Sequence, residues 1–248
     1  MTGNSGPDPA PRIALFGSGQ LAYALAGILP LFGEVITLGR AQADLRRPET
    51  LGAILDKVQP DIIFNAAAHT KIDQAETEPD LAMTVNGLAP AALANWARAT
   101  GAKLIHFSTD YVFDGKKEGP YLETDTPNPL NVYGRSKLAG DEAIMGAGGE
   151  CYIFRTSWLY SLYGHNFPKT ILRLAQTRSS LEVVADQVGA PTSAEFLALA
   201  ASWVVFQPRK AWGLYNLSAS GAVSWHELAR YLVQKALEMG QSLALKPE

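Results

Sequence analysis

A threonine, a tyrosine and a lysine are the residues of this sequence best suited to chemistry. Tyr133 and Lys137 are four residues apart, so on a helix both side chains lie on one face. A phenol ordinarily loses its proton at about pH 10, and a nearby ammonium favours the phenolate, so we expect Lys137 to lower the pKa of Tyr133. The Thr109 hydroxyl can hold a substrate oxygen beside the phenol. This pattern predicts a site that moves a proton on or off a carbinol oxygen.

A glycine-rich segment predicts where a dinucleotide binds. Residues 17–22 read Gly-Ser-Gly-Gln-Leu-Ala, which fits G-x-G-x-x-A between a predicted strand and a predicted helix. Gly17 and Gly19 permit a tight turn and a close backbone approach, and the helix N-terminus can receive a pyrophosphate. A plain glycine-rich turn is the alternative, and the motifs downstream favour a cofactor.

The end of the second predicted strand bears on the choice of nicotinamide cofactor. A site for NAD usually places Asp or Glu there for the ribose 2′-hydroxyl, whereas Arg suits a 2′-phosphate. Here Gly39 and Arg40 occupy that place, and a guanidinium binds phosphate well. We therefore expect NADPH, with NADH left open and a solvated surface arginine as the alternative. Asp44 and Leu45 are expected to flank the adenine.

Strands and helices that alternate along the chain must position these groups. Predicted strands cover residues 12–16, 35–38, 61–64, 103–107 and 152–155, and predicted helices cover 20–29, 48–58, 81–99 and 132–145. Pro90 predicts a kink or a break in the third of these helices. The alternation is typical of an α/β fold, a Rossmann-type doubly wound parallel sheet. In that context the Tyr133–Lys137 spacing indicates catalysis rather than an amphipathic helix with an exposed lysine.

Small residues follow the third predicted strand. Ala66 and Ala67 allow a cofactor to approach the backbone closely, although simple packing of helix on strand also explains them. His69 is equally a candidate for the cofactor side and for an ordinary loop histidine.

Beyond Thr156 the alternation loosens. We expect a Rossmann core over 12–156 and a mixed substrate-binding part over 157–248, a small C-terminal subdomain from which some segments return to the core. A helix is expected over 166–175, strands over 181–184 and 214–217, and capping boxes at 192–195 and 224–227. The first eleven residues are rich in Gly and Pro and are expected to form a flexible leader.

Composition excludes several function classes. The 248 residues carry a net charge of −3 with no basic run, which gives nucleic-acid binding little electrostatic support. Cys151 is the single cysteine and the four histidines are scattered, so we predict no disulfide framework and no metal site. No window of 18 uncharged apolar residues and no signal peptide is evident. We therefore expect no membrane partner and a cytoplasmic location.

Five longer stretches carry a family resemblance. They are PDIIFNAAAHT at 60–70, STDYVF at 108–113, PLNVYG at 129–134, RTSW at 155–158 and DQVGAPT at 186–192. With these stretches the chain resembles the extended short-chain dehydrogenase/reductase superfamily and, within it, the dTDP-4-dehydrorhamnose reductase family. The Tyr-Gly-x-x-Lys element is shared by the whole superfamily, whereas RTSW and DQxGAPT are much narrower. The likeness runs from about residue 12 to near the end.

The resemblance implies a reaction and a substrate. NADPH would reduce the C4 ketone of dTDP-6-deoxy-L-lyxo-4-hexulose (dTDP-4-dehydro-6-deoxy-L-mannose), a dTDP-linked 4-keto-deoxysugar, to dTDP-L-rhamnose for polysaccharide biosynthesis. Tyr133 would be the proton donor, and Lys137 would hold the nicotinamide ribose. Thr109 and Asp110 would line the sugar, and Trp158 would form a flat apolar wall, with a core tryptophan as its alternative.

The same likeness assigns further contacts. Candidates for hydrogen bonds to the sugar nucleotide are Tyr111, Asn166 and Gln187. Residues expected to face the cofactor are Gly19, Gln20, Leu21, Ala68, His69 and Thr70.

Two departures from the family pattern bear on these expectations. The family's phosphate loop usually reads G-x-x-G-x-x-G, so the loop here is one residue short and ends in Ala22. The family pattern also continues beyond residue 248 through an Arg-Pro-containing segment that closes over the substrate. We expect cofactor binding to depend less on that segment than turnover does.

Other readings stay open from the sequence. One is a noncatalytic, NADP-binding regulatory subunit of the methionine adenosyltransferase beta type. Another is a reductase or epimerase that acts on a different nucleotide sugar. The RTSW and DQVGAPT stretches favour the reductase. A homodimer and a Mg²⁺ ion at a subunit contact are likewise left open.

Overall fold

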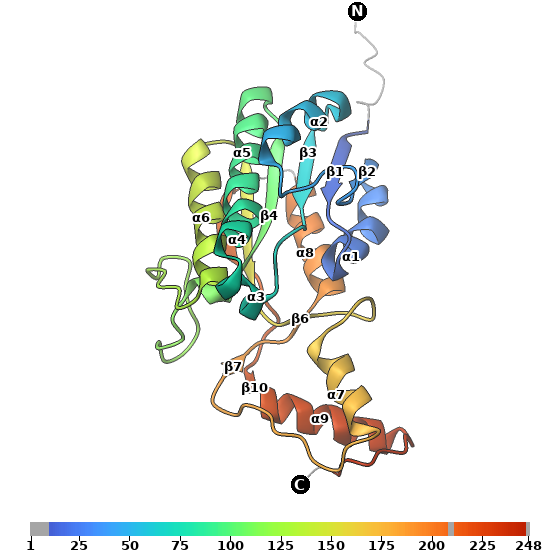
Figure 1. The fold of residues 1–248 in the computed structure, drawn as a ribbon. Coiled ribbons are helices and arrows are strands. Elements are labelled where there is room, and N and C mark those ends of the chain that lie inside the picture. The colour runs from blue at the N-terminus through green and yellow to red at the C-terminus, as the bar shows by residue number, and fades with distance from the viewer. Residues whose placement is uncertain (1–9, 208–210, 247–248) are drawn as a thin grey trace, which may run out of the picture.

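The computed structural model describes residues 10–207 and 211–246, so the expected leader at 1–11 lies almost wholly outside the described residues. A six-stranded, all-parallel sheet with the order β2-β1-β3-β4-β5-β9 forms its centre (Figure 1). This confirms the predicted α/β, doubly wound fold. The strands are β1 (Arg12–Phe16), β2 (Glu34–Leu38), β3 (Ile62–Asn65), β4 (Lys103–Thr109), β5 (Cys151–Thr156) and β9 (Gly213–Asn216).

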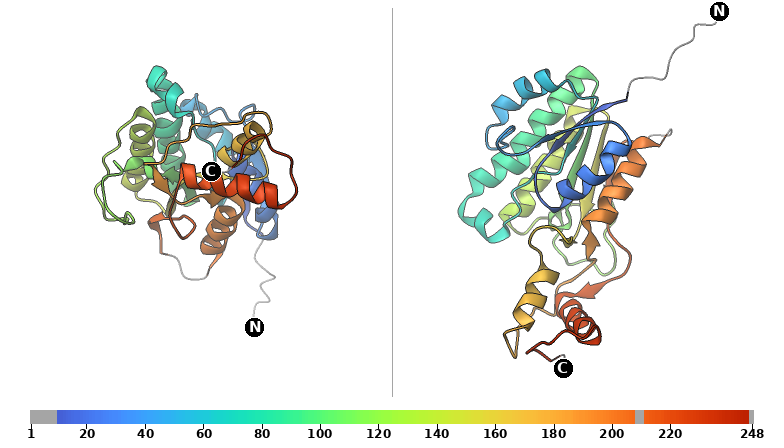
Figure 2. Two further views of the ribbon diagram at one scale, coloured as in Figure 1. Left: turned by 90° about the horizontal axis from the view of Figure 1, so that it is seen from below. Right: turned by 90° about the vertical axis from the view of Figure 1, so that its right-hand side faces the viewer.

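Helices cover both faces of the sheet. Figure 2 shows α1 (Gln20–Ile28) and α8 (Ala194–Phe206) on one face, with α2 (Leu51–Val58), α5 (Ala89–Thr100) and α6 (Val132–Ala147) on the other. Successive strand residues point to opposite faces. Ile13 and Leu15 of β1 therefore enter the core under α1 and α8, and Ala14 and Phe16 enter the other core. Short helices connect these elements: η1 (Leu29–Leu31), η2 (Pro48–Thr50), α3 (Ile72–Thr77), α4 (Pro79–Met83), η3 (Thr84–Leu88) and η4 (Asp110–Val112).

The helix expected over 81–99 has an irregular centre. It is built from α4, a π-helical turn at η3, and α5. Pro90 is the second residue of α5, which continues η3 without a break, and a proline removes the hydrogen bond to the carbonyl four residues earlier, so the irregularity lies in the turn that Pro90 disturbs. A π turn accommodates one extra residue and turns a side chain out of the helical register. That side chain is Asn86.

A small lobe lies below the carboxyl ends of the strands (Figure 1). It consists of α7 (Phe167–Ala175), α9 (Trp225–Glu238) and the antiparallel pair β7 (Val188–Gly189) and β10 (Val223–Ser224). Its own apolar cluster includes Ile171 of α7 and Val233 of α9. A second short pair, β6 (Leu159–Tyr160) with β8 (Thr192–Ser193), joins the segments that link the lobe to the core. Between β7 and β10 in sequence, α8 packs on the core sheet and β9 forms one of its edge strands.

Two local expectations in this half were wrong. No strand forms over 181–184, because Leu181 and Val183 pack on the lobe's helices and the neighbouring ladder is made by β7 instead. No capping box forms at 192–195, because Ser193 is the N-cap of α8 and accepts from the N–H of Phe196. The box at Ser224–Glu227 is confirmed. Within the described ranges, the helices are too short or too polar to cross a bilayer.

Candidate active site

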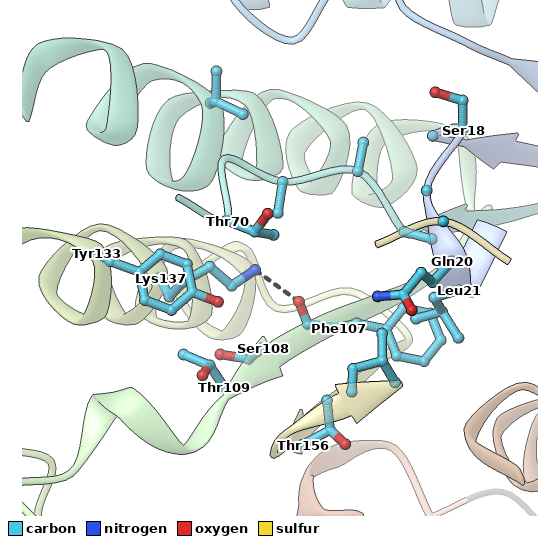
Figure 3. Close-up of a pocket in the computed structure, with 18 of the residues that line it drawn as sticks. Ser18, Gln20, Leu21, Thr70, Phe107, Ser108, Thr109, Tyr133, Lys137 and Thr156 are labelled. Atoms are coloured by element: carbon cyan, nitrogen blue, oxygen red, sulfur yellow. Dashed lines mark hydrogen bonds between the residues drawn. The ribbon is translucent and has the colours of Figure 1, made fainter. Parts of the chain in front are cut away.

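A cavity opens where the strand order reverses. Strands β2 and β3 lie on opposite sides of β1, and ligands of open α/β sheets bind at such a point beyond the carboxyl ends of the strands. The cavity has a volume of about 660 Å³. It is lined by residues that follow β1, β2, β3, β4 and β5, and by Trp225 from the small lobe. Figure 3 shows part of this lining.

The glycine-rich loop forms one wall. Gly17 has φ +118°, and a Cβ there would lie 3.0 Å from the carbonyl carbon and oxygen of Ala66, so only glycine fits the turn. Gly19 is the N-cap of α1 and supplies no side-chain cap. The N–H groups of the first turn of α1, with Gln20 and Leu21, therefore face the cavity without a capping side chain. The short G-x-G loop thus still delivers an open helix N-terminus.

Arginines gather at the far end, beyond β2. Arg40, Asp44 and Leu45 all line the cavity. Asp44 is engaged by Arg46, whose Nε donates to Asp44 Oδ2 at 2.8 Å and holds the pKa of that carboxyl below its ordinary value. Arg40 forms no ion pair with any described residue. This end of the cavity therefore presents a cation, and its carboxylate is already neutralised.

The loop after β3 forms the adjoining wall. Ala66, Ala67, Ala68 and Thr70 line the cavity, whereas His69 does not. The backbone of His69 is held by Asn86, whose Oδ1 accepts from His69 N and whose Nδ2 donates to His69 O, each at 2.9 Å.

The start of α6 is fixed so that Tyr133 enters the cavity. Asn131 is the N-cap, and its Oδ1 accepts from the N–H of Gly134 at 2.7 Å. A Cβ at Gly134 would collide with the carbonyl oxygen of Tyr111, so glycine lets α6 pack directly on η4. Tyr133 and Lys137 then both line the cavity from one face of α6 (Figure 3).

The Tyr133 phenol is less acidic than we expected from the sequence. Burial raises the pKa of Tyr133, while a hydrogen bond with Thr109 opposes the rise and Asp110 adds to it. The predicted lowering of the Tyr133 pKa is therefore wrong for this structure, in which loss of water around the phenolate is the largest cause of the shift. A phenol that keeps its proton at neutral pH can act as a proton donor.

Lys137 is buried and is 1% exposed. Its Nζ donates to the Phe107 carbonyl at 2.7 Å (Figure 3) and lies 3.0 Å from His106 Nε2. Burial lowers the pKa of Lys137 to about 8, and Asp141 on the next turn of α6 opposes that shift. Lys137 is therefore close to its titration point at physiological pH.

Thr109 ends β4 beside the phenol. Its Oγ1 accepts from Tyr111 N at 3.2 Å and donates to Asp110 Oδ1 at 3.1 Å. Burial raises the pKa of Asp110 to about 6, with the Thr109 hydrogen bond opposing the rise. Thr109, Asp110 and Tyr111 all line the cavity.

The end of the cavity nearest the small lobe is aromatic. Trp158 lines it, and Trp225 stacks on Trp158. Asn166 and Gln187 do not line the cavity. Asn166 is instead the N-cap of α7, and its Nδ2 donates to Gln20 Oε1 at 2.8 Å.

Sequence reasoning missed several lining residues. Trp225, directly after the N-cap of a predicted capping box, and Arg46, next to the predicted adenine contacts, carried a local signal. Tyr163 and His165, in the loop before α7, carried none. No group of three or more His, Cys, Asp or Glu side chains among the described residues could hold a metal ion, so the structure gives a Mg²⁺ site no support.

Comparisons with known proteins agree on one family. Residues 12–247 match the family model described as the RmlD substrate binding domain. The dTDP-4-dehydrorhamnose reductase of Shigella flexneri is 44% identical over 243 residues, which cover 94% of this chain and 81% of that protein. The crystal structure of dTDP-4-dehydrorhamnose reductase from Bacillus anthracis in complex with NADP superposes with a TM-score of 0.88 at 34% identity, covering 96% of this chain and 84% of that one. A UDP-glucose 4-epimerase from Thermus thermophilus, at 19% identity and a TM-score of 0.77, shares the fold alone.

Proposed function

Because this chain belongs to the RmlD family of dTDP-4-dehydrorhamnose reductases, we propose that it reduces the C4 ketone of dTDP-6-deoxy-L-lyxo-4-hexulose to dTDP-L-rhamnose, with NADPH as reductant. The reaction belongs to dTDP-rhamnose biosynthesis. One observation carries the proposal: Thr109, Tyr133 and Lys137 line the same cavity as the glycine loop and the open N-terminus of α1.

The cavity suits a dinucleotide. At Gly17 the backbone of the loop lies against that of Ala66 with no room for a Cβ, which leaves a smooth wall between β1 and β3. The uncapped N–H groups at the start of α1 suit a pyrophosphate. Gly17, Gly19, Gln20 and Leu21 would hold the pyrophosphate side. The remaining cofactor contacts that we propose are Ala66, Ala67, Ala68, Thr70, Asp44 and Leu45.

Arg40 supports NADPH over NADH. A ribose 2′-phosphate needs a cation, and Arg40 has none of the described carboxylates as an ion-pair partner. A ribose 2′-hydroxyl needs a carboxylate, and Arg46 already engages the nearby Asp44. The charge at this end of the cavity thus matches the phosphorylated cofactor.

Three side chains perform the proton chemistry. Bound NADPH supplies a hydride to the carbonyl carbon. As the C–H bond forms, the π electrons of the carbonyl move to its oxygen, which takes the proton from Tyr133 Oη. The ketone becomes a secondary alcohol and the phenol becomes a phenolate, which one proton from solvent restores. Thr109 holds the reacting oxygen beside the phenol, and Lys137 holds the nicotinamide ribose and stabilises the transient phenolate.

The sugar end would bind the deoxysugar by apolar contact. Trp158 offers a flat apolar surface to the C6 methyl group and the C–H groups of the deoxysugar, and Asp110 and Tyr111 offer polar contacts. Asn166 and Gln187 would join them only if the small lobe moves toward the cavity, because neither lines it in this structure.

A turnover assay tests the proposal. The purified chain is mixed with NADPH and the enzymatically made 4-keto sugar nucleotide, and the loss of NADPH absorbance is compared with the product formed. We expect one dTDP-L-rhamnose for each NADPH oxidised. NADPH binding without turnover would point instead to the noncatalytic regulatory subunit. A protein that purifies with tightly bound NAD and equilibrates two sugar epimers would point to an epimerase.

A further inference from the structure

Strand β4 of the sheet holds the Lys137 amine by hydrogen bonds. Two acceptors of β4 lie within hydrogen-bond distance of its Nζ: the Phe107 carbonyl at 2.7 Å and His106 Nε2 at 3.0 Å. Both His106 and Lys137 are buried, with exposures of 0% and 1%. A lysine ammonium has three N–H donors. Two of them are therefore directed into the sheet, and one remains for the cavity.

His106 can accept this hydrogen bond only in one protonation state. Burial, with Lys137 adding to the effect, lowers the pKa of His106 well below its ordinary value, so the imidazole is neutral. Its Nε2 accepts when the ring proton is on Nδ1. Asn65, on β3, places its Nδ2 3.1 Å from Nδ1, while its Oδ1 accepts from the Ala67 N–H at 3.3 Å. The two ends of an amide occupy equivalent positions, so turning the Asn65 amide exchanges the long bond to Ala67 for a bond that Oδ1 accepts from an Nδ1–H.

We propose that His106, backed by Asn65, is a positioning residue for the proposed ketone reduction: it aims the Lys137 amine at the cavity and sustains its charge. A buried ammonium without enough acceptors loses its proton instead of remaining charged. Of the two acceptors for the Lys137 ammonium, His106 Nε2 is the one that belongs to a side chain. It is buried, so water cannot replace it. The inference rests on the proposed function only for the identity of the reaction.

The other groups near Lys137 must be kept constant in any test. Asp141, one turn along α6, favours the ammonium and is itself paired with Arg155 of β5 at 3.1 Å. Tyr133, one turn back on α6, and Asp110, in η4, lie on the cavity side. None of these four residues is changed in the variants below.

A pair of amide variants tests the proposal. The amide of His106→Gln reaches the place of Nε2 and can accept from Lys137, whereas the amide of His106→Asn reaches only the place of Nδ1. Loss of a hydrogen bond to a charged group should lower the Lys137 pKa by about one to two units. We expect the basic limb of the kcat/KM profile to move to lower pH by about that amount in His106→Asn, and to stay near the wild-type position in His106→Gln.

A merely structural role would give a different result. It would lower kcat/KM equally at every pH, and Ile105→Val, a buried change on the opposite face of β4, serves as the control for such damage. The pH dependence of NADPH binding is measured in parallel, because Lys137 would hold the ribose. That readout needs no sugar nucleotide, so it tests His106 even if the proposed reaction fails. Unchanged limbs in His106→Asn, or equal shifts in the Asn and Gln variants, would overturn the proposal.

Discussion

The indole rings of Trp158 and Trp225 lie face to face, with centroids 3.4 Å apart and planes 8° apart. Trp158 follows β5 of the core, whereas Trp225 begins α9 of the small lobe. Phe167, the first residue of α7, packs on Trp225 with ring centroids 4.4 Å apart. The aromatic wall at the end of the cavity nearest the small lobe is therefore built jointly by the core and the lobe, and its position depends on how the lobe packs against the core.

Replacing Tyr133 by Phe should remove the proton donor and leave the cofactor's surroundings intact. We expect kcat to fall by about 10²- to 10⁴-fold, the usual contribution of general acid catalysis, while the NADPH dissociation constant changes little. NADPH oxidation and cofactor fluorescence titration measure the two effects. Tyr121→Phe is the matched control, because its hydroxyl bonds to Asp114 outside the cavity. Wild-type turnover in Tyr133→Phe would show that another group donates the proton.

Arg40→Ala should change the preference between the two nicotinamide cofactors. Loss of a charge-assisted contact to the 2′-phosphate would weaken NADPH binding by about ten- to a hundredfold and leave NADH binding unchanged. Dissociation constants for both cofactors measure the change. Arg47→Ala is the control, since Arg47 is exposed, pairs with Glu49 and does not line the cavity. If both cofactors weakened equally, Arg40 would have no role in reading the 2′-phosphate.

Gly17→Ala should destabilise the protein even without cofactor. The new Cβ would require φ near +118° and would press on the Ala66 backbone, so we expect a loss of about 1–3 kcal/mol in the free energy of unfolding. Gly19→Ala is the matched control, because φ there is −84° and nothing lies within 4 Å of its Cβ. Denaturant titration of both variants provides the comparison. Equal stability of the two would contradict the strained turn.

Asp110 should make stability depend on pH. Its folded-state pKa of about 6 is above the ordinary value of 3.8, so the stabilisation from its proton is full below 3.8 and is lost as pH rises through 6. Asp110→Asn lacks this dependence. The free energy of unfolding of the variant minus that of the wild type should therefore be larger at pH 7.5 than at pH 4, by on the order of 1–3 kcal/mol. Denaturant midpoints at the two pH values measure the gain, and parallel pH curves would contradict it.

Local sequence signals predicted the framework well. The strand, glycine loop and helix at 12–28 are contiguous, so the residues that predict the phosphate-binding turn are also the residues that form it. The same holds for Tyr133 and Lys137, whose spacing alone places them on one face of α6. The alternation of elements then determined the parallel sheet, because a right-handed crossover leaves few alternatives.

Contacts between distant segments could not be predicted in this way. His106 and Lys137 are 31 residues apart, and nothing in either segment indicates that their side chains meet. The burial that raises the Tyr133 pKa likewise comes from elements that only the fold assembles. Pro90 predicted an irregularity in the helix expected over 81–99, but nothing in the sequence indicated that the turn would bring Asn86 to His69 and Ser136.

Asn86 has a consequence for the precision of hydride transfer. Its side chain bonds the backbone of His69 on one side and the hydroxyl of Ser136, on α6, at 3.0 Å on the other. The buried amide of Asn86 thus links the loop after β3, against which a nicotinamide would lie, to helix α6, which carries the Tyr133 phenol. Thermal drift of either surface would stretch the same short bridge, so the hydride donor and the proton donor would be kept in register by a residue that does not line the cavity.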